Sequence, residues 1–289
     1  MASTWHTVAT HDVRLLRHQL EQVFALPKEY GFLNYLRCHD DIGWGLDYDF
    51  LRWFGVDEVA HKKFLNDYLT GQWQGSPSRG ELYNNDPRLG DARLCGTTAS
   101  LCGVEKARRE EDVRALSLAL RRDLMLHAFM FTLSGIPVLY SGDEIAQLND
   151  YSYHDDPNKA PDSRFLHRGA MDWEAAEKRH DPESVQGKIF SALTGLEELR
   201  RAHRVFDAGA DVWLLLTGDD SVLGIGRYNK GEKLAALFNF ADSDRVVPVN
   251  TPGSSTNLLT GEPADKDGVR LWPGAFVWLI CDFDKEGTM

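Results

Sequence analysis

The amino-acid sequence contains two short apolar runs that are suited to buried strands and that each end abruptly in charged residues. The first run, residues 32–38, is followed by His39-Asp40-Asp41, and the second, residues 136–140, is followed by Ser141-Gly-Asp-Glu144. Adjacent carboxylates repel one another, so an apolar strand does not normally end in them unless a ligand, an ion or a partner charge lies there. The residues alone allow two interpretations of His39-Asp40-Asp41, a functional site at the carboxyl end of its strand or a solvated strand end.

Apolar residues recur at helical spacing before, between and after the two predicted strands. The predicted helices cover residues 13–24, 112–133 and 184–203, and Ser184 is placed to cap the last of them. Alternation of helices and strands indicates parallel strands joined by helices. Two such strands cannot close an α/β barrel, which takes eight strands and about 250 residues. The sequence therefore predicts either a very small sheet or, as the stronger hypothesis, part of a larger fold.

The pattern changes near residue 205, where short runs rich in Val, Leu and aromatic residues alternate with Gly, Asn, Asp and Pro. These runs are Val212–Thr217, Val222–Tyr228, Lys233–Phe240, Arg245–Val249 and Phe276–Cys281. Such spacing is typical of antiparallel strands. We predict an α/β domain over residues 1–204, with long loops at 45–108 and 141–183, and an all-β antiparallel domain over 205–289. An excursion of that length inside a compact domain is usually a functional loop or a small inserted subdomain. Residues 45–108 are otherwise irregular, with a short helical pattern near Val56–Leu69.

Composition excludes several classes of partner. A net charge of −12 argues against nucleic acid and anionic membranes. No apolar run approaches ~18 residues, so no transmembrane span is expected. The four cysteines show neither paired nor metal-ligand spacing, and the first residues do not resemble a secretory signal. These features predict a cytoplasmic protein with no metal ion and no other cofactor.

Four segments together resemble glycoside hydrolase family 13, the α-amylase family, and within it the amylosucrases and sucrose hydrolases. Residues 34–44 resemble the family's strand-seven motif and residues 135–144 its strand-eight motif, whereas 90–97 and 158–165 resemble loop segments of amylosucrases. The resemblance covers nearly the whole chain. It implies that the α/β part is the portion of a (β/α)8 (TIM) barrel that contains strands seven and eight, and that the all-β part is the family's C-terminal domain.

The resemblance also implies roles for individual residues. His39 and Asp40 would hold the 2- and 3-hydroxyls of a glucosyl ring, and Asp40 would be the third catalytic carboxylate, which stabilises the transition state. An anionic group beside the reacting carbon favours an oxocarbenium-like transition state. Asp41 and Arg93 would contact the fructosyl half of sucrose. Arg164 would lie at the pocket floor, in a salt bridge with a carboxylate from outside this chain.

Retaining glycosidases need two further carboxylates, a nucleophile and an acid/base about 5 Å apart. By the resemblance both precede the His-Asp motif, where this chain offers only Asp12, Glu21 and Glu29, none in the family's pattern. We therefore expect the chain alone not to turn over sucrose, and we expect the N-terminal part of the same barrel as its partner. The parent enzyme would transfer glucose from sucrose to an α-1,4-glucan, or to water, with retention. The alternatives are a sucrose-hydrolysing or phosphorolytic relative, and a non-catalytic carbohydrate-binding remnant.

Four residues near these motifs keep more than one interpretation. Trp44 is either a platform for stacking a sugar or a packing anchor. Asp143 and Glu144 either bind a calcium-like ion or, as the favoured alternative, have a structural role. His154 begins a second His-Asp-Asp sequence, which is typical first of a turn and only secondarily of a substrate contact. Uncovered strand edges and sheet faces further predict poor solubility of the isolated chain.

Overall fold

Three helices of the computed structural model lie where the spacing of apolar residues predicts them. The structure describes residues 1–248, 255–265 and 268–281. Helices α2 (Arg14–Phe24), α7 (Val113–Thr132) and α9 (Val185–Ala202) confirm the predictions to within one residue at each end. Ser184 caps α9 as expected, because its Oγ accepts a hydrogen bond from the Gly187 N–H at 2.8 Å.

The remaining helices have five to twelve residues, and most of them had no predicted counterpart. They are α1 (Ala2–Thr10), α3 (Tyr48–Arg52), α4 (Glu58–Leu69), α5 (Thr98–Cys102), α6 (Val104–Arg109) and α8 (Trp173–Glu177). Five 3-10 turns accompany them: η1 (Asp143–Ile145), η2 (Tyr151–Asp155), η3 (Ser163–His167), η4 (Lys178–His180) and η5 (Arg204–Phe206). Among the helices described, none has both the length and the apolar character needed to cross a bilayer.

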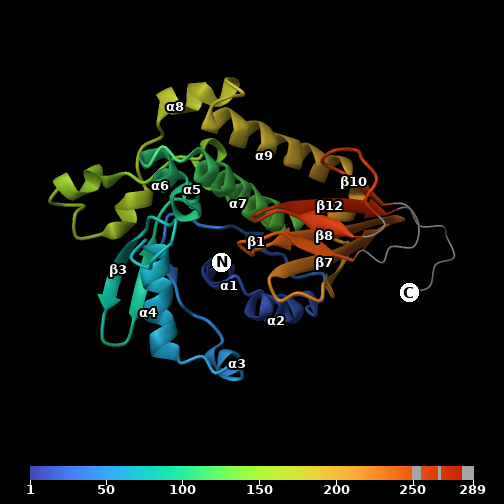
Figure 1. Ribbon diagram of the computed structural model, residues 1–289, viewed down its shortest axis with the longest axis horizontal. Helices are drawn as coiled ribbons and strands as arrows, with labels where there is room; N and C mark the ends of the chain where they lie inside the picture. Colours follow the sequence, from blue (N-terminus) through green and yellow to red (C-terminus); the bar gives the residue numbers. More distant parts are fainter. Residues whose placement is uncertain (249–254, 266–267, 282–289) are drawn as a thin grey trace. The chain divides into compact units, whose positions relative to one another are not determined.

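The chain divides into two units, each built from segments that are far apart in the sequence. The first unit contains residues 1–9, 35–124 and 139–193, and the second contains residues 10–34, 125–138 and 194–289. Figure 1 shows the elements of both.

A five-stranded antiparallel sheet forms the centre of the second unit, and Figure 1 draws β12, β8 and β7 side by side. In spatial order its strands are β10 (Ser255–Asn257), β12 (Phe276–Cys281), β8 (Glu232–Asn239), β7 (Val222–Asn229) and β6 (Asp211–Leu215). A separate antiparallel pair consists of β9 (Arg245–Val247) and β11 (Val269–Leu271). The predicted antiparallel character after residue 205 is confirmed. The three-residue strands β10 and β11 were not predicted, and Val249 of the fourth predicted strand lies outside the described residues.

The central strands of this sheet are covered on both faces. Phe238 of β8 packs edge-on against Phe129 of α7, with ring centroids 5.8 Å apart. Its neighbour Leu237 points to the opposite face, where it belongs to a buried cluster with Val247 and Leu271. Burial on both faces explains why β7 and β8 appear in the sequence as continuous apolar runs rather than alternating ones.

Two arginines of the second unit close the C-terminal end of α7. Arg227 of β7 is fully buried, and it donates hydrogen bonds to the carbonyl oxygens of Thr132 and Val205, both at 2.7 Å. Arg200 of α9 donates to the carbonyl oxygen of Gly135 at 3.1 Å. Cations at the end of a helix satisfy carbonyl groups that lack a helical partner and interact favourably with the helix dipole. The end of α7 is thereby fixed to the sheet.

The two strands that precede the acidic residues pair with each other in parallel, as expected. Leu33 of β1 (Leu33–Asn34) is in register with Ile136 of β5 (Ile136–Pro137). The predicted strand lengths, 32–38 and 136–140, are wrong, because each observed strand has two residues. Within the described residues each strand has a neighbour on one side only, so a single short ladder of hydrogen bonds holds it. Leu33 and Ile136 are 64% and 63% exposed.

Gly135 makes the close approach of these two strands possible. Its φ of +110° lies in a region that side chains rarely adopt, and a Cβ atom there would collide with the carbonyl oxygen of Phe32. The Ile136 N–H donates to that same oxygen at 2.8 Å. The turn from α7 into β5 therefore requires glycine at position 135.

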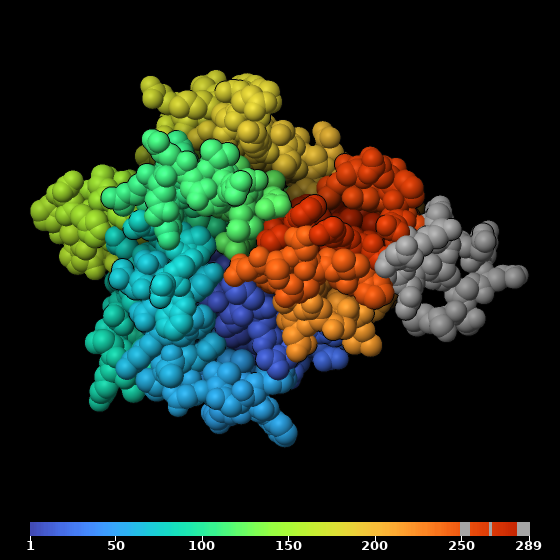
Figure 2. Space-filling view, viewed as in Figure 1, coloured from blue at the N-terminus to red at the C-terminus, as the bar shows by residue number. Residues whose placement is uncertain are grey.

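The segment 45–108, which we expected to be irregular apart from one helix, contains ordered structure of the first unit. An antiparallel sheet of order β2-β4-β3 combines Ile42–Gly43, Asp91–Cys95 and Glu81–Asp86. The blue and cyan atoms of this segment lie together in Figure 2. Trp44 is 7% exposed, and its indole N–H donates to Asn66 Oδ1 at 2.7 Å. Trp44 is therefore a packing anchor between the sheet and α4.

Candidate active site

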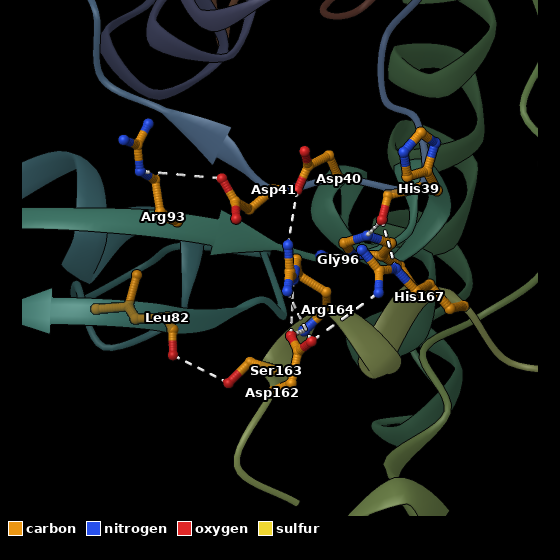
Figure 3. A network of polar contacts seen from close by, with 11 residues as sticks. His39, Asp40, Asp41, Leu82, Arg93, Gly96, Asp162, Ser163, Arg164 and His167 are labelled. Atoms are coloured by element: carbon orange, nitrogen blue, oxygen red, sulfur yellow. Dashed lines mark hydrogen bonds and ion pairs between the residues drawn. The ribbon is translucent and has the colours of Figure 1, made fainter. Parts of the chain in front are cut away.

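The three polar residues His39, Asp40 and Asp41 form a turn between the segment that follows β1 and strand β2 (Figure 3). Strand β2 pairs with β4 so that Gly43 is opposite Arg93. A Cβ atom at position 43 would collide with the Arg93 guanidinium, so glycine is needed there for Arg93 to lie against the strand. This pairing places Arg93 Nε 3.9 Å from Asp41 Oδ1. Two positions that are far apart in the sequence thus meet at the turn.

Arg164 reaches the same turn from η3. Its Nη1 lies 3.2 Å from Asp40 Oδ1, while Nε and Nη2 contact the two oxygens of Asp162 at 2.8 Å and 2.9 Å. Its guanidinium also lies over the ring of Tyr83 on β3, 4.8 Å from the centroid. A two-point contact with a carboxylate fixes the plane of an arginine. Within the described residues both carboxylate partners of Arg164 belong to this chain, and the expected partner from outside it stays a prediction.

The two adjacent carboxylates have different environments. The backbone N–H of Asp41 donates to Asp40, and with Arg164 it lowers the pKa of the exposed Asp40 carboxyl. Burial, and then the charge of Asp40, raises the pKa of Asp41. When the surroundings shift the pKa values of two neighbouring carboxyl groups in opposite directions, the two groups can have different roles. Asp40 is therefore suited to remain an anion in contact with a ligand.

The residues after β5 have a structural role. Asp143 Oδ1 lies 2.8 Å from Arg37 Nε, and both side chains are 3% exposed. Glu144 accepts a hydrogen bond from the Gly142 N–H at 2.8 Å. In the part of the chain that the structure describes, no group of three or more His, Cys, Asp or Glu residues could hold a metal ion. The favoured structural interpretation of Asp143 and Glu144 therefore agrees with their contacts.

His154 lies near the same sheet but is directed to another carboxylate. Its Nε2 is 3.0 Å from Glu81 Oε1 on β3, and the hydroxyl of the buried Tyr153 donates to the other oxygen of Glu81. The Asn158 N–H donates to Asp156 Oδ1 at 3.0 Å, which is the turn chemistry expected for this sequence. His154 therefore connects the turn of η2 to strand β3.

The structure brings all five predicted site residues, His39, Asp40, Asp41, Arg93 and Arg164, into the first unit. It adds four residues that sequence reasoning missed, namely Tyr83, Asp162, His167 and Arg168. They contact the turn or its arginines. Asp162 lies inside the segment 158–165 that resembles an amylosucrase loop, so the resemblance pointed to this segment but not to Asp162 itself. No signal in the sequence pointed to the other three.

Comparison with known proteins gives a fold but no family assignment. No family model matches the chain. The fold is similar to that of an alpha-amylase from Geobacillus thermoleovorans, solved in complex with acarbose, at 17% identity and a TM-score of 0.50. That match covers 98% of this chain and 47% of the alpha-amylase, so the chain spans about half the length of that enzyme.

Two further solved structures show partial similarity. A trehalose-6-phosphate hydrolase from Bacillus licheniformis matches 56% of this chain and 39% of its own, at 18% identity and a TM-score of 0.43. AmyP, solved in complex with maltose, matches 58% of this chain and 36% of its own, at 17% identity and a TM-score of 0.47.

Proposed function

We propose that this chain contributes the substrate-holding wall of the active site in an amylosucrase-like enzyme of the α-amylase family. The complete enzyme would transfer glucose from sucrose to an α-1,4-glucan, or to water, with retention of configuration. The observation that carries the proposal is the turn at His39-Asp40-Asp41, in which each aspartate faces an arginine from another element. The motifs of the sequence and the alpha-amylase fold support it.

In this proposal Asp40 is the anion that stabilises positive charge at the reacting carbon. Its lowered pKa keeps it ionised at neutral pH, and its exposed carboxylate can accept hydrogen bonds from sugar hydroxyls. His39 would donate to a neighbouring hydroxyl of the same ring. Hydrogen bonds to a hydroxyl near the reacting carbon strengthen as oxocarbenium character develops. Asp41 and Arg93 would contact the fructosyl half, where a paired carboxylate and guanidinium offer both an acceptor and donors.

The parallel pair β1–β5 would represent strands seven and eight of a (β/α)8 barrel. The remaining strands, with the nucleophile and the acid/base, would come from the N-terminal part of that barrel. Leu33 and Ile136 support this, because two apolar side chains that are more than half exposed on paired strands suit contact with further strands. The chain by itself would bind substrate without breaking the glycosidic bond.

Purified chain is expected to release no fructose from sucrose, because none of its carboxylates matches the nucleophile or the acid/base. Sugar binding is expected all the same, measured by calorimetric titration with sucrose. Asp40→Asn should weaken that binding by roughly tenfold or more, since a hydrogen bond to a charged group contributes about 1.5–3 kcal/mol. Asp49→Asn is the matched control, because the Asp49 side chain on α3 is 85% exposed. Fructose release by the chain alone would contradict the proposed incompleteness.

Fructose release is expected to appear when a polypeptide with the N-terminal strands of such a barrel is produced together with this chain. The partner would supply the two absent carboxylates and would cover the exposed side of β1 and β5. The measurement is sucrose turnover by the mixture, compared with each part alone. Leu33→Asp should abolish complementation, whereas Leu216→Asp, at a residue that is more exposed, should leave it intact. Complementation that survives Leu33→Asp would contradict the role given to this surface.

A further inference from the structure

The carbonyl oxygen of His39 is held by the end of η3 and the residue that follows it. Arg168 Nε donates to this oxygen at 2.5 Å. His167 Nε2 lies 3.4 Å from the same oxygen, and Figure 3 shows His167 beside His39. The oxygen belongs to the peptide group that joins His39 to Asp40. Its direction therefore helps to fix the backbone at Asp40, from which the side chain extends toward Arg164.

The contacts of His167 select one form of its ring. The Gly96 N–H at the end of β4 donates to His167 Nδ1 at 3.1 Å. A backbone amide can only donate, so Nδ1 must be the unprotonated, accepting nitrogen. The hydrogen is then on Nε2, where it can be donated to the His39 carbonyl. The neutral ring with Nε2–H satisfies both contacts, whereas the imidazolium would place N–H against N–H at Gly96.

The surroundings of His167 favour this neutral ring. The side chain is 5% exposed, so water does not replace its partners. Burial, together with the positive charge of Arg37, lowers the pKa of His167 to about 4. The hydrogen bond to the His39 carbonyl raises this pKa, Arg168 lowers it, and the carboxylate of Asp143 raises it, and burial outweighs the two opposing effects. Arg37 Nη1 also donates to the backbone carbonyl of His167 at 3.4 Å, which fixes the residue itself.

We propose that His167 is a positioning residue for Asp40, acting as a neutral donor that links the Gly96 amide to the His39 carbonyl. The proposal rests on the function assigned to Asp40 above. Protonation of this ring would put a second N–H against the Gly96 N–H and displace the ring from Gly96. Arg168 alone would then hold the His39 carbonyl in its present place, and the peptide group that carries Asp40 would shift. Ligand binding at the turn would then fail in acid through a residue that does not touch the ligand.

The first test is spectroscopic and uses the whole chain labelled with 15N in histidine. At pH 7 the His167 signals are expected to show an unprotonated Nδ1 and a protonated Nε2, and to keep this pattern until the pH falls to about 4. The His167→Gln variant identifies these signals by their loss. A protonated Nδ1 at pH 7, or a ring that titrates at the ordinary histidine value, would overturn the proposal.

The second test compares two substitutions. The amide of His167→Gln can accept from Gly96 and donate to His39, whereas His167→Leu can do neither. In His167→Leu the carboxyl pKa of Asp40, followed by 13C NMR and assigned with Asp40→Asn, is expected to rise toward its ordinary value, because the Asp41 N–H and Arg164 contacts are lost. His167→Gln is expected to leave the Asp40 titration and sucrose affinity near those of the wild type.

The two readouts separate this proposal from the proposed function. Absence of sucrose binding in the wild type would argue against the function of the turn, while the Asp40 titration would still report on His167. An unchanged Asp40 titration in His167→Leu would overturn the positioning role even if sucrose binds. If His167→Leu does not fold, the ring form in the wild type and the Asp40 titration in His167→Gln decide the question.

Discussion

Arg227→Met is expected to lower the free energy of unfolding by about 2–6 kcal/mol, because two buried carbonyl groups lose their donor and each such loss costs about 1–3 kcal/mol. The guanidinium is fully buried and donates to the carbonyl oxygens of Thr132, Val205 and Asp207. Methionine fills part of the space but leaves the carbonyl groups of Thr132 and Val205 without this donor in a place that water does not reach, while the Asp207 carbonyl keeps its hydrogen bond from the Ala210 N–H. Denaturant unfolding followed by circular dichroism measures the effect.

Arg227 remains charged when unfolding is measured near neutral pH. Burial lowers its pKa to about 10, and the nearby Arg200 adds to that shift. The matched control is Arg88→Met, because the Arg88 side chain is 81% exposed beside Asp86. We expect the control to change stability by less than about 1 kcal/mol. Equal effects of the two substitutions would show that the carbonyl contacts of Arg227 do not hold the end of α7.

The buried pair between Arg37 and Asp143 is expected to show strong coupling in a double-mutant cycle. Arg37→Met or Asp143→Leu alone should each lower the free energy of unfolding by about 3–5 kcal/mol, because each leaves one uncompensated charge in the interior. The double variant should lose far less than the sum of the two, since it buries no charge. Denaturant unfolding of the four proteins gives the coupling energy.

The exposed pair of Arg52 and Asp49 serves as the control cycle. Its atoms are also close, 2.7 Å apart, but the side chains are 60% and 85% exposed. We expect a coupling of less than about 0.5 kcal/mol there, because water and salt screen the charges. Additive losses in the cycle of Arg37 and Asp143 would mean that the two side chains stabilise the first unit independently, and that their short contact contributes little.

Most of the second unit could be predicted from sequence because its strands have a strong local signal. Runs such as Val222–Tyr228 and Phe276–Cys281 are rich in β-branched and aromatic residues and end at turn residues. Strand β3, Glu81–Asp86, was missed because its polar residues and its asparagines are typical of loops. Its pairing depends on β4, and therefore on tertiary structure. Strand β1 is shorter than predicted for the same reason, because an apolar run does not indicate how many strands will pair with it.

In the candidate site, the positions of the residues could be predicted from the sequence, whereas their contacts could not. His39, Asp40 and Asp41 could be located because an apolar run ending in charged residues is unusual, and Arg93 and Arg164 because their segments resemble a known family. Which side chain pairs with which could not be predicted. Asp162 is two residues from Arg164, yet nothing in that spacing indicates that Arg164 would also reach Asp40. Nothing in the sequence indicated that His167 lies between the Gly96 N–H and the His39 carbonyl.

The two-point contact between Arg164 and Asp162 makes Arg164 a rigid part of the site before any ligand arrives. Two of its nitrogens are engaged by Asp162, and only one reaches Asp40. A sugar hydroxyl that displaces the Asp40 contact therefore breaks one hydrogen bond and does not release the arginine. The conformational entropy of this long side chain is lost during folding rather than during binding. A ligand that binds here would contact a preorganised arginine, so its binding free energy would not be reduced by the cost of ordering this side chain.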